Sequence, residues 1–82
     1  MPVLRRVDST TTVEVERCQL ARAHEHSGIS LCSFFVAGSQ PIVLGQRYRL
    51  DLEDEALLVV PIESIQREIR WTQILAVIVE GP

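Results

Sequence analysis

Lysine is absent from the sequence, and the eight basic residues, all arginine, are outnumbered by eleven Asp and Glu residues. The formal net charge is −3, and the arginines are dispersed along the chain rather than gathered in one segment. Proteins that bind nucleic acid without sequence preference commonly carry a basic patch and a pI above about 9. The charge balance therefore argues against nucleic acid as a partner.

Cysteines and long apolar runs are also scarce. The two cysteines, Cys18 and Cys32, are too few for a disulfide-dense secreted scaffold, so we expect free, buried thiols in a reducing cytoplasm. The longest apolar run, residues 74–79, is far shorter than the roughly 20 residues of a membrane span. Arg5 and Arg6 are followed by polar residues rather than by the apolar region of a secretory signal. The sequence thus predicts a cytoplasmic protein without a membrane span.

Catalytic motifs are missing as well. The sequence holds no nucleophile elbow, HExxH segment, P-loop or pair of carboxylates in an apolar setting. A chain of 82 residues makes one domain and leaves little room for a cleft that encloses a substrate. We therefore expect a noncatalytic protein with a single domain over residues 1–82, in which residues 1–9 form a flexible N-terminal arm.

Alternation of apolar and polar residues is what the sequence does contain. Residues 11–16 alternate in this way, which predicts a half-buried strand. The apolar positions then shift by one residue, and a bulge or tight turn over residues 16–19 would absorb the shift. Residues 47–53 alternate without a fault, and the acidic residues 53–55 that follow predict a turn.

The C-terminal third is apolar and less regular. Residues 56–62 are almost continuously apolar but contain Pro61, which marks an edge, a bulge or the end of a strand. Residues 62–69 fit a helix by the spacing of their isoleucines and a strand by an alternation that continues to Trp71. The β-forming neighbourhood favours a strand. Thr72-Gln73 is interpreted as a two-residue hairpin connection.

Residues 74–79 are apolar on both faces of a predicted strand, which indicates a strand that is covered on both sides or that pairs with another subunit. Glycine and proline at residues 27–28, 38–41 and 45 predict the loops. The fold class is therefore all-β, a small antiparallel β-barrel of about six strands, with one short helix as the alternative for residues 62–69.

Several motifs follow one another in a distinctive order. A Gly-Ile-Ser segment with an apolar continuation precedes a proline-containing loop, a glycine and an alternating strand. A later Ile-Arg-Trp element precedes the final apolar run. These motifs lie at residues 28–36, 38–41, 44–46, 48–52, 69–71 and 74–79. In this order and spacing, the chain resembles the PilZ domain, a small β-barrel of bacteria, over about residues 10–80.

The resemblance implies a ligand that the motif residues of this chain do not support. Typical PilZ domains bind cyclic di-GMP through an R-x-x-x-R segment and a D-x-S-x-x-G motif. Gly28 stands at the motif aspartate and Ser33 at the motif glycine, so only Ser30 fits, and no arginine lies four residues beyond Arg5 or Arg6. Each lost charge-assisted hydrogen bond is worth about 1.5–3 kcal/mol. We therefore expect no cofactor and no standard cyclic di-GMP site.

The degenerate motif resembles the adaptor class of the family, which acts by protein–protein contact, for instance with type IV pilus or motility machinery. On this hypothesis the partner is another protein or a second copy of the chain. Phe34 and Phe35 are consecutive, so in a strand one of them must lie outside the barrel. The candidate interface residues are Phe34, Phe35, Ile74 and Val77.

The alternative hypothesis is a cyclic-dinucleotide sensor with a nonstandard site. A guanidinium can bind a phosphate through two hydrogen bonds and can stack on a base, so arginines would dominate such a site. The candidate ligand-binding residues are Arg5, Arg6, Ser30 and Arg70.

His24 and His26 invite a metal hypothesis, because two histidines at this spacing point the same way in a strand. The sequence offers no obvious third ligand, so we expect a polar strand end and no metal. Cys18 and Cys32 could form a redox-switchable bridge if the fold made them neighbours. We interpret them instead as small apolar side chains of the interior.

Overall fold

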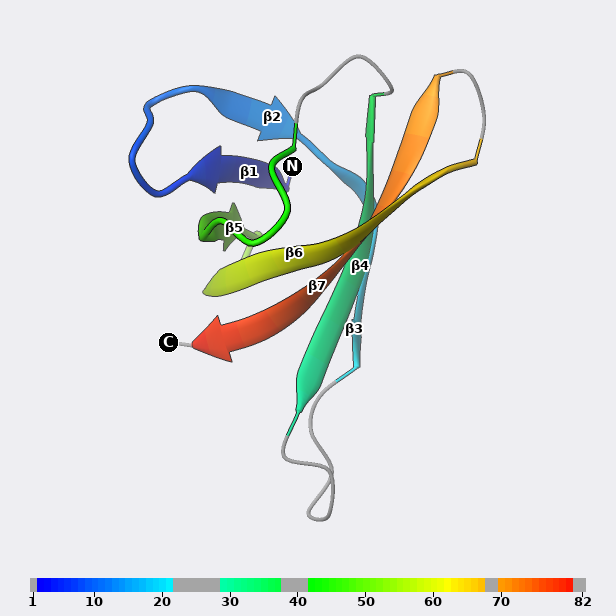
Figure 1. Ribbon diagram of the computed structural model, residues 1–82. Helices are drawn as coiled ribbons and strands as arrows, with labels where there is room; N and C mark the ends of the chain where they lie inside the picture. Colours follow the sequence, from blue (N-terminus) through cyan, green and yellow to red (C-terminus); the bar gives the residue numbers. More distant parts are fainter. Residues whose placement is uncertain (1, 22–28, 38–41, 68–69, 81–82) are drawn as a thin grey trace.

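A computed structural model describes residues 2–21, 29–37, 42–67 and 70–80, and in these residues it contains strands and no helix (Figure 1). The predicted all-β class is confirmed. Residues 62–66 belong to a strand, so the helical alternative for this segment is wrong. The seven strands are β1 (Val3–Arg6), β2 (Thr12–Glu14), β3 (Glu16–Ala21), β4 (Ser30–Ala37), β5 (Tyr48–Asp51), β6 (Ala56–Gln66) and β7 (Trp71–Glu80).

The strands form one antiparallel sheet in the order β2-β1-β5-β6-β7-β4-β3, and this sheet is not a closed barrel. The expected closure is wrong because the two edge strands are consecutive in the chain, with only Val15 between them. β2 pairs with β1, whereas β3 pairs with β4, so no ladder joins the two edges of the sheet. The chain leaves one edge and enters the other, and the sheet curls (Figure 1).

The predicted bulge over residues 16–19 is confirmed. The pairing of β3 with β4 shifts its register between Glu16 and Gln19. Arg17 has a φ of 54°, in the left-handed region that residues with a side chain rarely adopt. The bulge therefore lies where the chain passes from one edge of the sheet to the other, and bulges are known to bend strands in this way.

Two further irregularities agree with the sequence. Pro61 lies at a register shift between β6 and β7, which is the bulge that a proline inside a strand favours. The acidic residues 53–55 form the predicted turn between β5 and β6, which the Leu52 N–H closes by donating to the Glu55 carbonyl at 2.8 Å.

The predicted hairpin connection at Thr72-Gln73 is wrong. Both residues lie inside β7, where they pair with Gln66 and Ile65 of β6. The pair lacks the Asn-Gly or glycine-rich residues that tight hairpins favour, so nothing in its backbone opposes continuation of the strand. The pairing extends to the Arg67 N–H, which donates to the Trp71 carbonyl at 3.2 Å.

The flexible arm expected over residues 1–9 is also wrong, because residues 3–6 form β1 in the sheet between β2 and β5. Leu4 holds this strand in place: its side chain is fully buried and lies opposite Leu50 of β5. Removing a leucine side chain from water contributes about 1.5–3 kcal/mol, which explains why so short a segment is ordered.

The core lies on the concave side of the curled sheet, where every second residue of each strand points inward. In β4 the buried residues are Cys32, Phe34 and Val36, which alternate with half-buried ones. The other strands contribute their own inward residues, so one continuous cluster forms. It consists of Leu4, Val15, Cys32, Phe34, Val36, Tyr48, Leu50, Leu57, Val59, Ile74 and Ala76.

Candidate functional site

The four predicted interface residues separate into two pairs on opposite sides of the sheet. Phe34 and Ile74 are 0% and 1% exposed, so their assignment to an interface is wrong. They are paired across β4 and β7 on the inward face, where they form part of the core. Phe35 and Val77 point outward and are half-buried. The two phenylalanines thus face opposite sides of the sheet.

Val77 lies at the centre of an apolar row on the outer side of the sheet. It pairs with Leu31 of β4 on one side and with Val60 of β6 on the other. Antiparallel sheets with one face on the core usually carry polar residues on the other face, which this row lacks. We call the surface around this row the outer apolar face. It consists of Leu31, Leu58, Val60, Leu75, Val77 and Val79.

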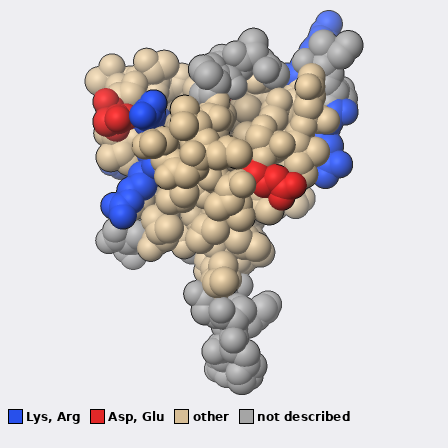
Figure 2. All heavy atoms as spheres, in the orientation of Figure 1, with Lys and Arg blue, Asp and Glu red and all other residues tan. Residues whose placement is uncertain are grey.

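Exposure and charge define the limits of the outer apolar face. Val79, at its end, is 48% exposed, whereas the other members shield one another and are half-buried. On the β6 side, Glu63 lies opposite Leu75. Figure 2 shows charged side chains in separate small groups on the side of the molecule in view. Glu63 therefore marks a polar limit of the face on the β6 side, and an apolar centre with a polar rim is the usual anatomy of a protein interface.

A shallow groove of about 230 Å³ continues this surface over β3 and β4. Leu31 and Leu75 form its apolar wall, and Gln19 and Ser33 contribute polar groups. Beyond it, Arg17 lies over the ring of Phe35, with 5.4 Å between the guanidinium carbon and the ring centroid. This cation–π contact covers Phe35, so the accessible apolar surface is centred on β7 rather than on the phenylalanine.

The four predicted ligand-binding residues are not gathered into one site. Ser30 begins β4 and pairs with Ile78, whereas Arg70 precedes the other end of β7. At about 3.3 Å per residue, the chain from Arg70 to Ile78 spans roughly 25 Å. Arg5 and Arg6 lie on β1, which β5, β6 and β7 separate from β4 within the sheet. The structure therefore does not support the nonstandard dinucleotide site that the sequence suggested.

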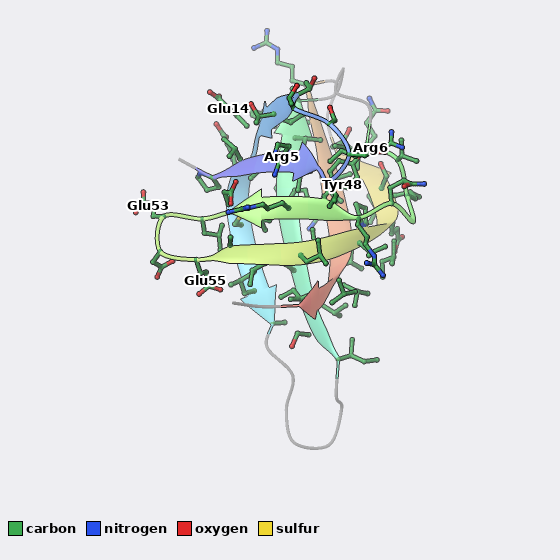
Figure 3. All side chains as sticks on the ribbon, turned by 90° about the vertical axis from the view of Figure 1, so that its left-hand side faces the viewer. Arg5, Arg6, Glu14, Tyr48, Glu53 and Glu55 are labelled. Atoms are coloured by element: carbon green, nitrogen blue, oxygen red, sulfur yellow. The ribbon has the colours of Figure 1, made fainter. Side chains whose placement is uncertain are left out.

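Arg5 and Arg6 point to opposite sides of β1. Arg5 faces outward, and its Nη1 donates a hydrogen bond to the Ser9 carbonyl at 3.0 Å. Arg6 has the parity of the buried Leu4 and lies directly opposite Tyr48, which is 4% exposed. Figure 3 shows Arg6 and Tyr48 close together at the same end of β1 and β5. Arg6 is thus an arginine on the core side of the sheet.

Arg6 lines a cavity of about 350 Å³ at this end of the sheet. Polar groups come from three lining residues that the sequence analysis missed: Ser9, Thr11 and Tyr48. The available signal was the two-residue spacing of Leu4 and Arg6, which places both side chains on one face of a strand. The remaining lining residues, which form the apolar wall, are Leu4, Val13 and Val43.

Both cysteines are free thiols, as predicted. Burial raises the pKa of Cys32 to about 11, and the nearby Cys18 adds to the increase. Burial also raises the pKa of Cys18, whose side chain is only half-buried. Since the thiolate is the reactive form of cysteine, both side chains are poor nucleophiles and poor metal ligands near neutral pH.

Two further observations bear on binding. Among the residues that the structure describes, no group of three or more His, Cys, Asp and Glu side chains could hold a metal ion. His24 and His26 lie outside the described residues. Within residues 2–21, 29–37, 42–67 and 70–80, there is also no helix long and apolar enough to cross a membrane.

Comparisons with protein-family models, with curated proteins and with solved structures give no match to this chain. The residues and the geometry described above are therefore the basis for assigning a function.

Proposed function

We propose that this protein is a noncatalytic interaction module, a PilZ-like adaptor that acts in the bacterial cytoplasm by protein–protein contact in signalling, motility or pilus regulation. The observation that carries the proposal is the outer apolar face. Folding requires the inward side of a sheet to be apolar, but it places no such demand on the outward side. The row formed by Leu31, Val77 and Val60 is therefore available for contact with a partner.

The shape of this surface supports a protein rather than a small molecule as the partner. The face extends over three neighbouring strands. In the part of the chain that the structure describes, its only hollow is the shallow groove beside Leu31 and Leu75. Small ligands usually bind in concave sites that bury most of their surface. Extended apolar surfaces with a polar rim instead fit other proteins.

The separation of Ser30 from Arg70 along β4 and β7 counts against the alternative, a nonstandard cyclic-dinucleotide site, and so supports a module that works without this ligand. Isothermal titration calorimetry with cyclic di-GMP tests this part of the proposal. We expect no heat of binding at micromolar protein concentration. Micromolar affinity would contradict the adaptor assignment and favour the sensor hypothesis.

Val77→Arg tests the interface directly, because it puts a charge at the centre of the outer apolar face. Val3→Arg is the matched control: it makes the same change at a half-buried, outward valine on β1, whose neighbours Glu14 and Asp51 can accommodate a positive charge. Central interface residues commonly contribute more than about 1–2 kcal/mol, so Val77→Arg should weaken association about tenfold or more.

The measurement is sedimentation velocity over a range of concentrations for self-association, together with cross-linked capture of the partner in bacterial cells. The control Val3→Arg should associate like the unmodified protein in both assays. If Val77→Arg also keeps its sedimentation behaviour and its cross-linked products, the outer apolar face is not the interface. Circular dichroism of both variants verifies that the sheet is retained.

A further inference from the structure

The cavity lined by Arg6 lies on the concave side of the sheet, away from the outer apolar face. Three adjacent chain segments build it: Arg6 ends β1, Tyr48 begins β5, and Thr11 immediately precedes β2. The Arg6–Tyr48 pair is the next inward pair along these strands, two residues beyond the buried Leu4–Leu50 pair. The polar groups thus occupy the end of the core, where an apolar side chain would be the default.

Arg6 is held at this end of the core by an ion pair with Asp8. Its Nε lies 2.9 Å from Asp8 Oδ1, an ion pair, but this nitrogen is buried and its N–H makes no hydrogen bond with correct geometry. The side chain is 39% exposed, so the guanidinium extends from the core toward solvent. A partly exposed arginine on the inward side of the sheet, beside a cavity, can bind an anion there.

The hydroxyl groups around Arg6 are arranged to donate. The Tyr48 hydroxyl accepts a hydrogen bond from the Val43 N–H at 3.1 Å, which leaves its own hydrogen for a second partner. The Ser9 Oγ accepts a hydrogen bond from the Thr11 N–H at 3.1 Å, so its own hydrogen is likewise left for a second partner. Arg6 and these hydroxyls can all donate, and none of the described residues that line the cavity is Asp or Glu.

The loop that closes the cavity is held in place before any ligand binds. Gly45 has a φ of 85°, which favours glycine, and its N–H donates to the Pro61 carbonyl of β6 at 2.8 Å. Together with the bond from Val43 to Tyr48, this anchors the segment that forms one wall. A preformed wall lowers the entropy that a ligand must lose on binding.

From this geometry we propose that the cavity binds a small organic carboxylate with a short aliphatic chain. Arg6 binds the carboxylate oxygens, the Tyr48 and Ser9 hydroxyls donate to them, and the aliphatic part packs against Leu4 and Val13. A guanidinium and a carboxylate form two parallel hydrogen bonds, which gives this pair its specificity. The site is separate from the outer apolar face, so it stands whether or not that face binds a protein.

Volume and charge restrict the ligand further. A cavity of about 350 Å³ is near the lower limit of ligand pockets, which run from about 300 to 1,000 Å³, so it suits a compact molecule. Asp8 offsets part of the charge of Arg6. A singly charged carboxylate is therefore favoured over a phosphate dianion, which would meet stronger repulsion from Asp8.

The test is a titration of the isotope-labelled full chain with pentanoate, followed by NMR. We expect saturable shifts of amide signals in residues 9–13 and 43–48. Pentylamine, which has the same chain and the opposite charge, should give no saturable shifts, and inorganic phosphate should bind at least about tenfold more weakly than pentanoate. Absence of saturable pentanoate shifts at millimolar concentrations would overturn the proposal, as would equal binding of the amine.

Variants then assign the binding to Arg6. Arg6→Gln should weaken pentanoate binding about tenfold or more, because it removes the charged donor. Arg49→Gln is the matched control from the neighbouring strand β5, and it should leave binding within about twofold because Arg49 points outward, pairs with Asp51 and does not line the cavity. Tyr48→Phe keeps the ring and removes the hydroxyl, so it tests the site if Arg6→Gln fails to fold. Unchanged affinity in Tyr48→Phe and in a folded Arg6→Gln would refute the assignment.

Discussion

The outer surface of this sheet has two halves that differ in chemistry although they share one backbone. Over β4, β7 and β6, the outward row is Leu31, Val77 and Val60. Over β2, β1 and β5, the corresponding row is Thr12, Arg5 and Arg49. The inward rows of both halves are mainly apolar, because both cover the same core, and Arg6 at the end of β1 is the charged exception. The difference therefore does not arise from folding.

We call the half of the outer surface over β2, β1 and β5 the charged half, and it shows how an outward surface stays hydrated. Arg5 lies directly opposite Arg49, and like charges at such positions are mildly destabilising. Each arginine has its own partner: Arg5 donates to the Ser9 carbonyl, and Arg49 Nε donates to Asp51 Oδ1 at 2.8 Å. Both contacts are local; the bond of Arg5 is partly buried and that of Arg49 is exposed. The central row of the other half, Leu31, Val77 and Val60, has no charged groups and presents only apolar side chains.

The largest expected effect is a difference in stability between two variants on the inner and the outer side of β4. Phe34→Ala should lower the free energy of unfolding by about 3–5 kcal/mol, since it removes a fully buried ring. Phe35→Ala, at the next residue on the outer side, should cost about 1 kcal/mol, mainly through its lost contact with Arg17. Urea denaturation measures both. Equal losses would mean that Phe35 belongs to the core and that the outer side is not free.

The second prediction concerns how the free energy of unfolding depends on pH through Cys32, in the inward row of β4. The raised pKa of Cys32, about 11 against an ordinary value of 9.0, means that the unfolded chain loses this proton first. The stabilising contribution is complete below pH 9.0 and is lost as the pH rises toward about 11. The slope is at most about 1.4 kcal/mol per pH unit for one group.

Cys32→Ala provides the control for this prediction. Urea midpoints of both proteins between pH 8 and about 11 should show a steeper fall for the unmodified chain, because alanine has no proton to lose. Parallel curves for the two proteins would show that the Cys32 thiol is as hydrated in the folded state as in the unfolded one. The inward row would then be less closed than its burial indicates.

The sequence predicted local structure well, because alternation and turn chemistry are local. The strand over residues 48–51, the acidic turn after it and the bulges at Arg17 and Pro61 all depend on neighbouring residues. The open edge of the sheet could not be predicted in this way. It depends on whether residues 12–14 pair with β1 or continue beside β4, which is a choice between strands that are distant in the sequence.

The candidate site was harder to predict for a related reason. In β7, residues 74–79 are apolar at odd and even positions alike, so periodicity cannot show which side faces the core. Ile74 and Val77 therefore looked equivalent, although the structure buries one and turns the other outward. Arg6 was noticed as an arginine but not as an inward residue, since β1 is too short for its alternation to stand out.

The smallest expected effect tests whether the charged half contributes to folding. Arg49→Leu removes the ion pair with Asp51, in which the arginine side chain is 53% exposed. Exposed ion pairs contribute about 0–1 kcal/mol, and relief of the repulsion from Arg5 offsets part of that loss. We therefore expect the free energy of unfolding to change by less than about 0.5 kcal/mol in urea denaturation.

Asp51→Asn is the control for this variant, because it breaks the same ion pair but leaves Arg49 opposite Arg5. It should destabilise the protein slightly more than Arg49→Leu, since the repulsion between the arginines remains and the partner of Arg49 is neutralised. A loss above about 1 kcal/mol in Arg49→Leu would exceed what an exposed pair can contribute. The charged half would then be part of what holds the sheet together, and the outer apolar face would lose its distinction as the half that folding does not explain.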